Sequence, residues 1–191
     1  GLQVDNCEVW VNAPEMPGCD GSSLPFVQAI DSVGTVPQAA VRSLLVIHEI
    51  SRLGNEESWI EARPAPSGMT AKYRLDFGRD NAIGRQTLAL TVTPDSFRRE
   101  LAPARTFMLK AEADWLRSQG LGTRATSQDL LVFDHEGPVD NELRYPDECV
   151  RHKLLDLVGD LALGGCDLLG HFVAHKSGHR LNAELVRILL T

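Results

Sequence analysis

Residues 151–161 read R-H-K-L-L-D-L-V-G-D-L, and this stretch decides how the last third of the chain folds. Its leucines and valines recur at helical spacing, which predicts a helix over residues 147–163. His152 and Asp156 are four residues apart, so their side chains leave one face of that helix one turn apart. Asp160 continues the polar stripe by another turn. An imidazole and a carboxylate placed in this way can bind one metal ion, and nitrogen and oxygen ligands suit zinc.

The same pair has a simpler interpretation, because a His-x-x-x-Asp pair on a helix is most often a surface hydrogen bond or a weak ion pair. Two features favour a metal site. The acidic stripe lies in a largely apolar segment, where an unpaired charge would be costly. Three more histidines, His171, His175 and His179, follow within nine residues of one another. The last of them comes after a Ser-Gly turn, from which the fold can bring it back toward the stripe.

Residues 151–161, followed by L-L-G-H-F-V-A-H-K-S-G-H at 168–179, resemble the zinc-dependent UDP-(3-O-acyl)-N-acetylglucosamine deacetylases of lipid A biosynthesis. The segment A-P-E-M-P-G-C-D-G-S-S-L-P-F-V at 13–27 is similar to that family's P-E-x-P-x-x-D-G-S-x-x-P-F signature. Further similar segments are N-A-I-G-R-Q at 81–86, A-R-T-F at 104–107 and L-R-Y-P-D-E at 143–148. The matches keep the family's order and extend over essentially the whole chain.

The resemblance implies a zinc amidohydrolase. It would remove the N-acetyl group from UDP-(3-O-acyl)-N-acetylglucosamine, giving acetate and the free amine in an early committed step of lipopolysaccharide synthesis. His152 and Asp156 would be zinc ligands, and Asp160 would orient His179. His179 would stabilise the tetrahedral oxyanion or protonate the leaving amine. From the residues alone, a histidine in the position of His179 is more often a turn residue.

The resemblance also implies three contacts to the substrate. Thr106 would donate its hydroxyl to the oxyanion, Lys153 would face the polar side of the substrate, and Phe107 would contact its sugar or acyl portion. Without the resemblance, Thr106 is better interpreted as a helix cap and Lys153 as a solvated charge beside Asp156. Residues 120–134 depart from the family's G-G-S-x-D-N segment on the side where sugar and acyl chain would lie.

The family has a further metal-binding helix with a Glu that acts as general base and a His that is the third zinc ligand, and neither is in this sequence. Because the chain begins at the segment that follows that helix, we expect a fragment of a longer enzyme that is inactive alone. His171 and His175 are the alternative third ligands, although the family uses their segment as a strand and turn. The alternative function is a catalytically silent homologue that acts as a binding or scaffold module. The retained histidines and aspartates favour the enzyme.

Strand patterns followed by helix patterns indicate an α+β fold, and the resemblance implies a two-layer sheet-and-helix sandwich. Residues 39–191 would form one complete domain, and residues 1–38 the C-terminal part of a similar first domain, with the active site between them. The predicted strands are 7–11, 43–50, 58–62, 71–77, 87–93 and 130–134. The predicted helices are 25–33, 94–101, 109–118, 147–163 and 181–190.

Composition limits the partners. A net charge of −7 argues against nucleic acid or an anionic membrane as an electrostatic partner, and no apolar run reaches the roughly 20 residues that span a bilayer. With the resemblance, we expect a monomeric cytoplasmic protein whose partner is a UDP-linked acylated amino sugar. The cysteines are few and show no C-x-x-C spacing, so we expect buried free thiols: Cys7, Cys19, Cys149 and Cys166.

Overall fold

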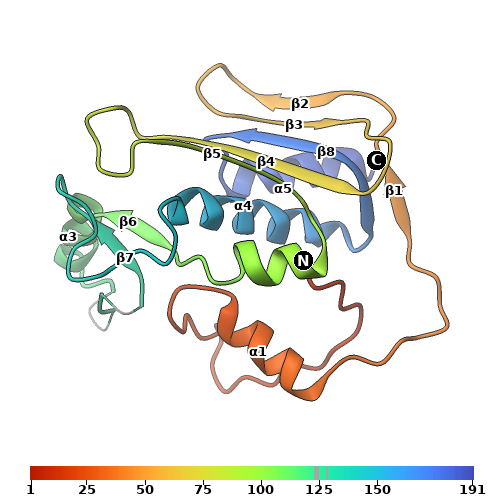
Figure 1. Cartoon of the computed structure of the whole chain (residues 1–191), viewed down its shortest axis with the longest axis horizontal. Helices are drawn as coiled ribbons and strands as arrows, with labels where there is room; N and C mark the ends of the chain where they lie inside the picture. The colour runs from red at the N-terminus through yellow and green to blue at the C-terminus, as the bar shows by residue number, and fades with distance from the viewer. Residues whose placement is uncertain (123–124, 128) are drawn as a thin grey trace.

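The computed structural model describes residues 1–122, 125–127 and 129–191. Residues 123–124 and 128, in the segment that departs from the family pattern, lie outside the described residues. The chain has a mixed α+β fold in which helices pack against one side of a sheet (Figure 1). This confirms the predicted fold class.

The main sheet is built around β8 (Asp167–His175), which follows the helix that carries His152 and Asp156. This strand pairs antiparallel with β3 on one side and parallel with β4 on the other, and its first residues pair in parallel with β1 (Leu44–Val46). The strand order is β2 (Ser51–Gly54), β3 (Trp59–Arg63), β8, β4 (Met69–Asp76) and β5 (Arg85–Thr91).

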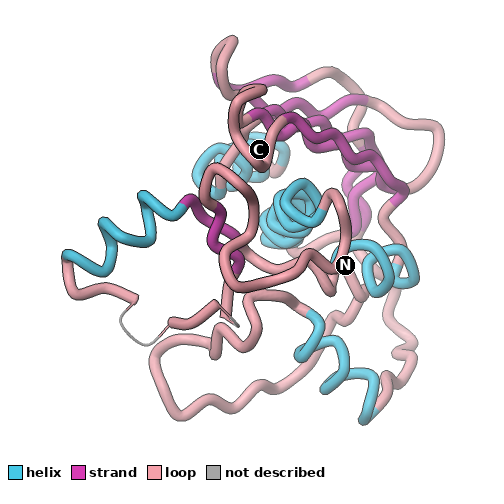
Figure 2. Tube along the Cα trace, turned by 60° about the vertical axis from the view of Figure 1, so that its left-hand side comes forward, coloured by secondary structure: helices cyan, strands magenta, loops and turns pink. Residues whose placement is uncertain are grey.

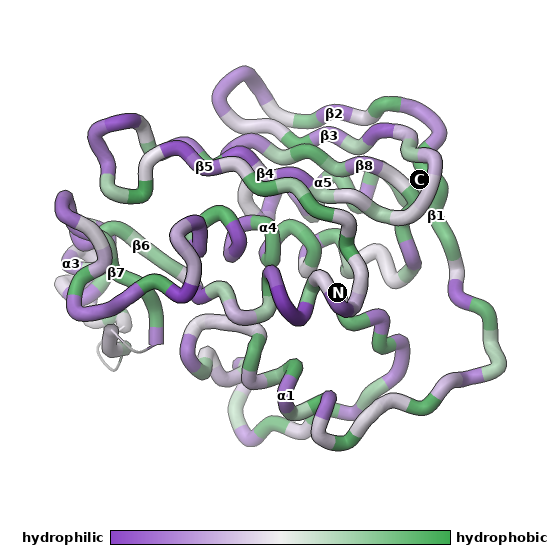
Figure 3. Tube along the Cα trace, viewed as in Figure 1, coloured by the Kyte–Doolittle hydropathy of each residue, from purple (hydrophilic) through white to green (hydrophobic). Residues whose placement is uncertain are grey.

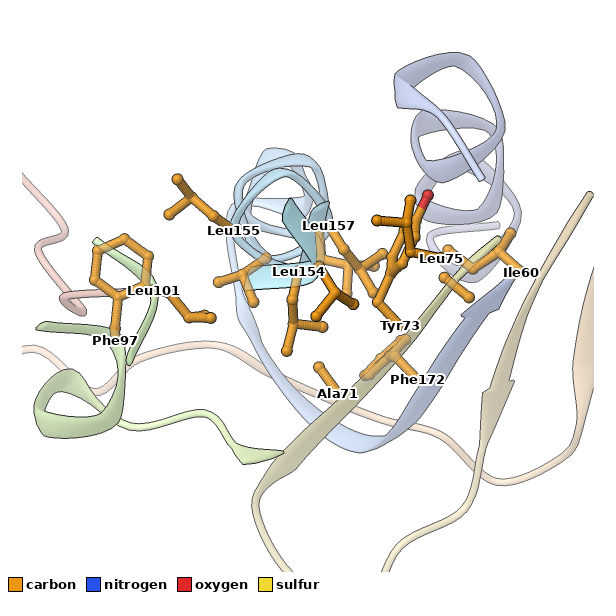
Figure 4. Close-up of a cluster of buried hydrophobic side chains, with 14 of the residues drawn as sticks. Ile60, Ala71, Tyr73, Leu75, Phe97, Leu101, Leu154, Leu155, Leu157 and Phe172 are labelled. Carbon is orange, nitrogen blue, oxygen red and sulfur yellow. The ribbon is translucent and has the colours of Figure 1, made fainter. Parts of the chain in front are cut away.

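Two helices, α4 (Glu148–Leu161) and α5 (His179–Leu189), pack on the same side of this sheet. Figure 2 shows the strands of this main sheet gathered on one side of the molecule. The apolar stripe of α4 follows from its leucine spacing and faces β4 and β8, where Leu154 and Leu157 meet Tyr73 and Phe172 without exposure to solvent (Figure 4). Removing one such side chain, as in Leu157→Ala, is expected to cost about 2–5 kcal/mol of stability.

The remaining elements lie at the side of this core. The helix α1 (Leu24–Val33) and the long N-terminal segment lie on the far side of α4 from the sheet, and β6, β7 and α3 form a separate group (Figure 1). In Figure 3, hydrophobic residues (green) alternate with hydrophilic ones (purple) along the main-sheet strands and α4, whereas the β2–β3 loop is mostly hydrophilic. The bounds are α2 (Pro94–Ser96), the π-helix η1 (Phe97–Leu101), β6 (Phe107–Leu109), α3 (Lys110–Ser118), β7 (Leu131–Phe133) and the 3-10 helix η2 (Ala162–Gly164).

Several predicted elements differ from the observed ones. The strand predicted at residues 7–11 is wrong, because Val9 and Val11 are exposed and the segment has no strand beside it within the described ranges. The helix predicted over 94–101 begins at the Thr93 cap but becomes a π-helix from Phe97. The strand predicted over 43–50 is confined to β1, and the pattern did not reveal β2.

The cysteines are free thiols as predicted, but only Cys149 is fully buried, whereas Cys7 and Cys19 are exposed. Burial raises the pKa of the Cys149 thiol to about 12, with a smaller contribution from the adjacent Glu148, so this thiol is unreactive. Among the described residues, no helix combines the length and the apolar character that crossing a membrane requires.

Candidate functional site

A cavity of about 960 Å³ lies beside α4, between the end of β4 and the segment that leads into β6. Its volume is within the range of small-molecule sites, about 300–1,000 Å³. The sequence predicted seven site residues, and six of them line this cavity: Thr106, Phe107, His152, Lys153, Asp156 and His179. The seventh, Asp160, lies next to His179 and hydrogen-bonds to it.

The predicted metal pair lies on one face of α4, with 3.4 Å between His152 Nε2 and Asp156 Oδ1. The other ring nitrogen, Nδ1, is 3.1 Å from the carbonyl oxygen of Ala104. Because a carbonyl only accepts hydrogen bonds, Nδ1 carries the proton and the lone pair of Nε2 is on the side of Asp156. Burial, assisted by Lys153 and opposed by Asp156, lowers the pKa of His152. A neutral imidazole is the form that binds a metal ion.

The donor types and orientation of this pair fit zinc, which takes imidazole nitrogen and carboxylate oxygen. Lys153 Nζ donates to Asp156 Oδ2 at 2.8 Å, so Oδ1 is the carboxylate oxygen that lies toward His152. In the part of the chain that the structure describes, no third histidine, cysteine or carboxylate joins them in a metal-binding group. If zinc binds here, the pair would supply two of the three protein ligands that a catalytic zinc site uses.

The alternative third ligands, His171 and His175, are excluded by strand geometry. Side chains alternate across β8, and Phe172 and Ala174 are fully buried. These two residues face the helices, so His171 and His175 lie on the opposite face of the sheet. His171 hydrogen-bonds there to Thr70, and neither histidine lines the cavity. The suggestion that one of them completes the metal site is wrong.

His179 begins α5 and lies against Asp160 of α4, as the sequence predicted. Its Nδ1 is 2.9 Å from Asp160 Oδ2 and 3.1 Å from Oδ1. The ring has its other nitrogen, Nε2, on the far side from the carboxylate. Asn182, which the sequence did not single out, donates from Nδ2 to the same Asp160 Oδ2 at 2.9 Å.

A buried ion pair joins the segment before β6 to the start of α4. Glu148, the first residue of α4, has no exposed side-chain area and receives Arg105 Nε on Oε1 at 2.8 Å. The backbone N–H groups of Arg105 and Arg144 also donate to its carboxylate. Burial alone would raise the pKa of Glu148, but these hydrogen bonds outweigh it and hold the pKa below its usual value. The pair fixes Ala104–Phe107 against the helix that carries His152.

Thr106 is positioned by backbone pairing on both sides of the chain. Its N–H donates to Gly21 O at 2.7 Å, and its carbonyl accepts from Leu131 N at 2.9 Å. Gly21 has φ +78°, and a Cβ there would lie 2.4 Å from Asp129 O, so only glycine fits this approach. The next helix, α3, begins at Lys110, so the interpretation of Thr106 as a helix cap is wrong. The ring of Phe107 meets His152 edge-on at 6.4 Å.

Sequence reasoning missed several cavity residues from other elements. Lys176 and Arg85 add two cationic side chains to that of Lys153, while Tyr73 and Phe77 add aromatic surface. Lys176 stands within the H-K-S-G-H segment, and its φ of +50° is an unusual backbone conformation for a lysine. Arg85 stands within N-A-I-G-R-Q and donates to Asp76 at 2.9 Å. Both quoted segments contained these residues, but only the tertiary structure brings their side chains to the cavity.

A family model described as UDP-3-O-acyl N-acetylglycosamine deacetylase matches residues 1–191. The chain is 41% identical over 186 residues to the UDP-3-O-acyl-N-acetylglucosamine deacetylase of Thermosynechococcus vestitus, covering 97% of this chain and 64% of that protein. It is 41% identical over 192 residues to the protein of the same name from Brucella ovis, covering 100% of this chain and 66% of that protein. The chain thus spans a little under two thirds of the length of these relatives.

Proposed function

The chain belongs to the UDP-3-O-acyl N-acetylglycosamine deacetylase family, and from this premise we propose that it provides the second half of a zinc-dependent amide hydrolase site. The substrate would be UDP-(3-O-acyl)-N-acetylglucosamine, and the products acetate and the free amine. One observation carries the proposal: the His152–Asp156 pair, with a neutral His152 ring, and the His179–Asp160 pair meet at one cavity of suitable volume.

His152 Nε2 and Asp156 Oδ1 would hold the zinc ion. Zinc bound there supplies Lewis-acid polarisation of the acetamide carbonyl and brings the pKa of a water molecule toward about 7. Both side chains are oriented by neighbours: Ala104 O fixes the tautomer of His152, and Lys153 binds one oxygen of Asp156. Such partners of metal ligands orient them and raise their affinity.

The proton-handling residue would be His179. With Nδ1 on Asp160, its Nε2 is the nitrogen that can reach a molecule in the cavity. When Nε2 also carries a proton, the ring would donate a hydrogen bond to the tetrahedral oxyanion or a proton to the leaving amine. The hydroxyl of Thr106, at the same cavity, would be a further donor to the oxyanion.

The lining of the cavity suits the two ends of such a substrate. Lys153, Lys176 and Arg85 place cationic groups where a nucleoside diphosphate would be stabilised. Phe77 and Phe107 meet edge-on with ring centroids 6.0 Å apart and offer apolar surface to the sugar or acyl portion. Lys153 is held 5.9 Å above the Tyr73 ring, which keeps its ammonium group at the cavity.

With two zinc ligands, these 191 residues alone have an expected zinc affinity and an expected activity. A catalytic zinc site needs three protein ligands, and the family's general base is a glutamate on a helix that this sequence does not contain. We therefore propose that the chain alone binds zinc weakly and hydrolyses little substrate. The third ligand and the base would come from the family's other metal-binding helix.

The test compares three preparations: this chain alone, the chain joined to the part of the Thermosynechococcus relative that it does not cover, and the joined protein with His152→Ala. Zinc content is measured after dialysis, and acetate release is measured with the acylated UDP-sugar. We expect stoichiometric zinc and turnover only in the second preparation. A joined protein that folds and binds zinc but releases no acetate would refute the proposed function, and full activity of the chain alone would refute the two-ligand argument.

A further inference from the structure

Asn182 is a buried polar residue beside the site, and the proposed mechanism gives it no role. It is 1% exposed and lies one turn after His179 on α5. Residues three apart on a helix share a face, so both side chains point to α4, where both donate to Asp160 Oδ2 at 2.9 Å. The sequence gives no sign of this, because Asp160 is 22 residues away from Asn182.

The orientation of the Asn182 amide is forced by its partner. A carboxylate only accepts hydrogen bonds, so Nδ2 must face Asp160, and the carbonyl oxygen Oδ1 then points away. This oxygen is buried and has no hydrogen-bond partner among the residues that the structure describes. An unpaired buried acceptor destabilises the fold. A leucine of similar size would avoid that cost, so stability alone does not explain an asparagine here.

Asp160, the hydrogen-bond partner of Asn182, also sets the orientation of the His179 ring. The side chain of His179 is 70% exposed, so packing does not hold its ring, and the ring depends on Asp160 for its orientation. Among the residues that the structure describes, the second hydrogen bond to Asp160 comes from Asn182, which is buried between α4 and α5. The buried Asn182 side chain therefore holds the carboxylate of Asp160, and that carboxylate holds the exposed ring of His179.

We propose that Asn182 is a positioning residue that fixes the carboxylate of Asp160 and thereby holds neutral His179 in the tautomer with its proton on Nδ1. Free imidazole side chains in water favour the proton on Nε2, so an acceptor fixed at Nδ1 is needed to reverse this preference. In the Nδ1–H form, Nε2 faces the cavity with its lone pair and can exchange a proton with a bound molecule. The importance of this tautomer for catalysis rests on the proposed function, whereas the tautomer itself does not.

The test reads the tautomer directly. Long-range proton–nitrogen correlation spectra of the nitrogen-15-labelled chain, without metal or substrate and at a pH where the ring is neutral, distinguish the two forms. We expect His179 of the unmodified chain to be mainly Nδ1–H. In Asn182→Leu the ratio of Nε2–H to Nδ1–H should rise about fivefold, a part of what one hydrogen bond to a carboxylate contributes, while the thermal midpoint stays equal or rises. If Asn182→Leu does not fold, Asn182→Ala replaces it with the same expected change in tautomer.

Leu185→Val is the matched control, because Leu185 is fully buried on the same helix and has no polar partner. It should lower the thermal midpoint and leave the tautomer of His179 unchanged. The proposal is overturned if the unmodified chain shows mainly the Nε2–H form, if the tautomer is unaffected by changing Asn182, or if Leu185→Val shifts it equally. Because no substrate is present, these outcomes are independent of whether the protein proves to be a deacetylase.

Discussion

Replacing Glu148 by glutamine should strongly destabilise the chain, because it disrupts a buried ion pair. The carboxylate of Glu148 has no exposed area and receives four N–H donors. Arg105 N and Nε donate to Oε1 at 3.0 and 2.8 Å. Arg105 Nη2 and Arg144 N donate to Oε2 at 3.1 and 2.7 Å.

The magnitude follows from this geometry. Glutamine has one carbonyl oxygen, so Glu148→Gln turns an NH₂ group toward two of these donors, and two charge-assisted hydrogen bonds are lost. It also leaves the Arg105 guanidinium buried without its counter-charge. Breaking a buried pair in this way costs about 3–5 kcal/mol. For a chain of 191 residues this lowers the thermal midpoint by roughly 6–20 °C.

The same pair predicts a pH dependence. Because the pKa of Glu148 is lower in the folded chain than in the unfolded chain, its contribution is complete above the unfolded-state pKa of about 4.3 and is lost as the pH falls through the folded-state pKa. Glutamine does not titrate. The difference in unfolding free energy between the unmodified chain and Glu148→Gln should therefore be full at neutral pH and should shrink in acid.

Urea denaturation at neutral pH and in an acidic series measures this difference. Glu142→Gln is the matched control, because Glu142 is exposed and only its backbone carbonyl bonds to Arg105. Its unfolding free energy should stay within about 0.5 kcal/mol of the unmodified chain. A Glu148→Gln chain that loses less than about 1 kcal/mol at neutral pH, or whose loss is the same in acid, would refute this reasoning.

The other predictions concern the site. In protein that performs the proposed reaction, His152→Ala should lose zinc, whereas His179→Ala should keep zinc and lower kcat by about 100-fold or more; loss of zinc from both would make His179 a ligand. Thr106→Val should lower kcat by about 100-fold with zinc unchanged, and an unchanged kcat would remove Thr106 from the oxyanion role. Asn182→Leu should lower kcat by about tenfold with an unchanged KM, and a rise in KM instead would indicate that Asn182 affects substrate binding. Elemental analysis of the unmodified chain after dialysis should find substoichiometric zinc, and tight zinc would require a third ligand within these residues.

The sequence by itself determined relations within single elements. The leucine and valine spacing of residues 151–161 predicted α4, and the four-residue spacing of His152, Asp156 and Asp160 placed them on one helical face. Both results depend only on the helical repeat, which is the same in every fold. The motifs shared with the deacetylase family likewise predicted His179 and Thr106 as site residues, and both line the cavity although they are far apart in the chain.

Tertiary structure decided which residues from different elements meet. Strand alternation turned His171 and His175 away from the site, and the Arg105–Glu148 pair brought Thr106 beside α4. The packing of α5 on α4 joined Asn182 to Asp160 and His179. The sequence could not reveal these contacts, because they depend on how whole helices and strands pack, and packing is fixed by many side chains together rather than by the spacing of any two.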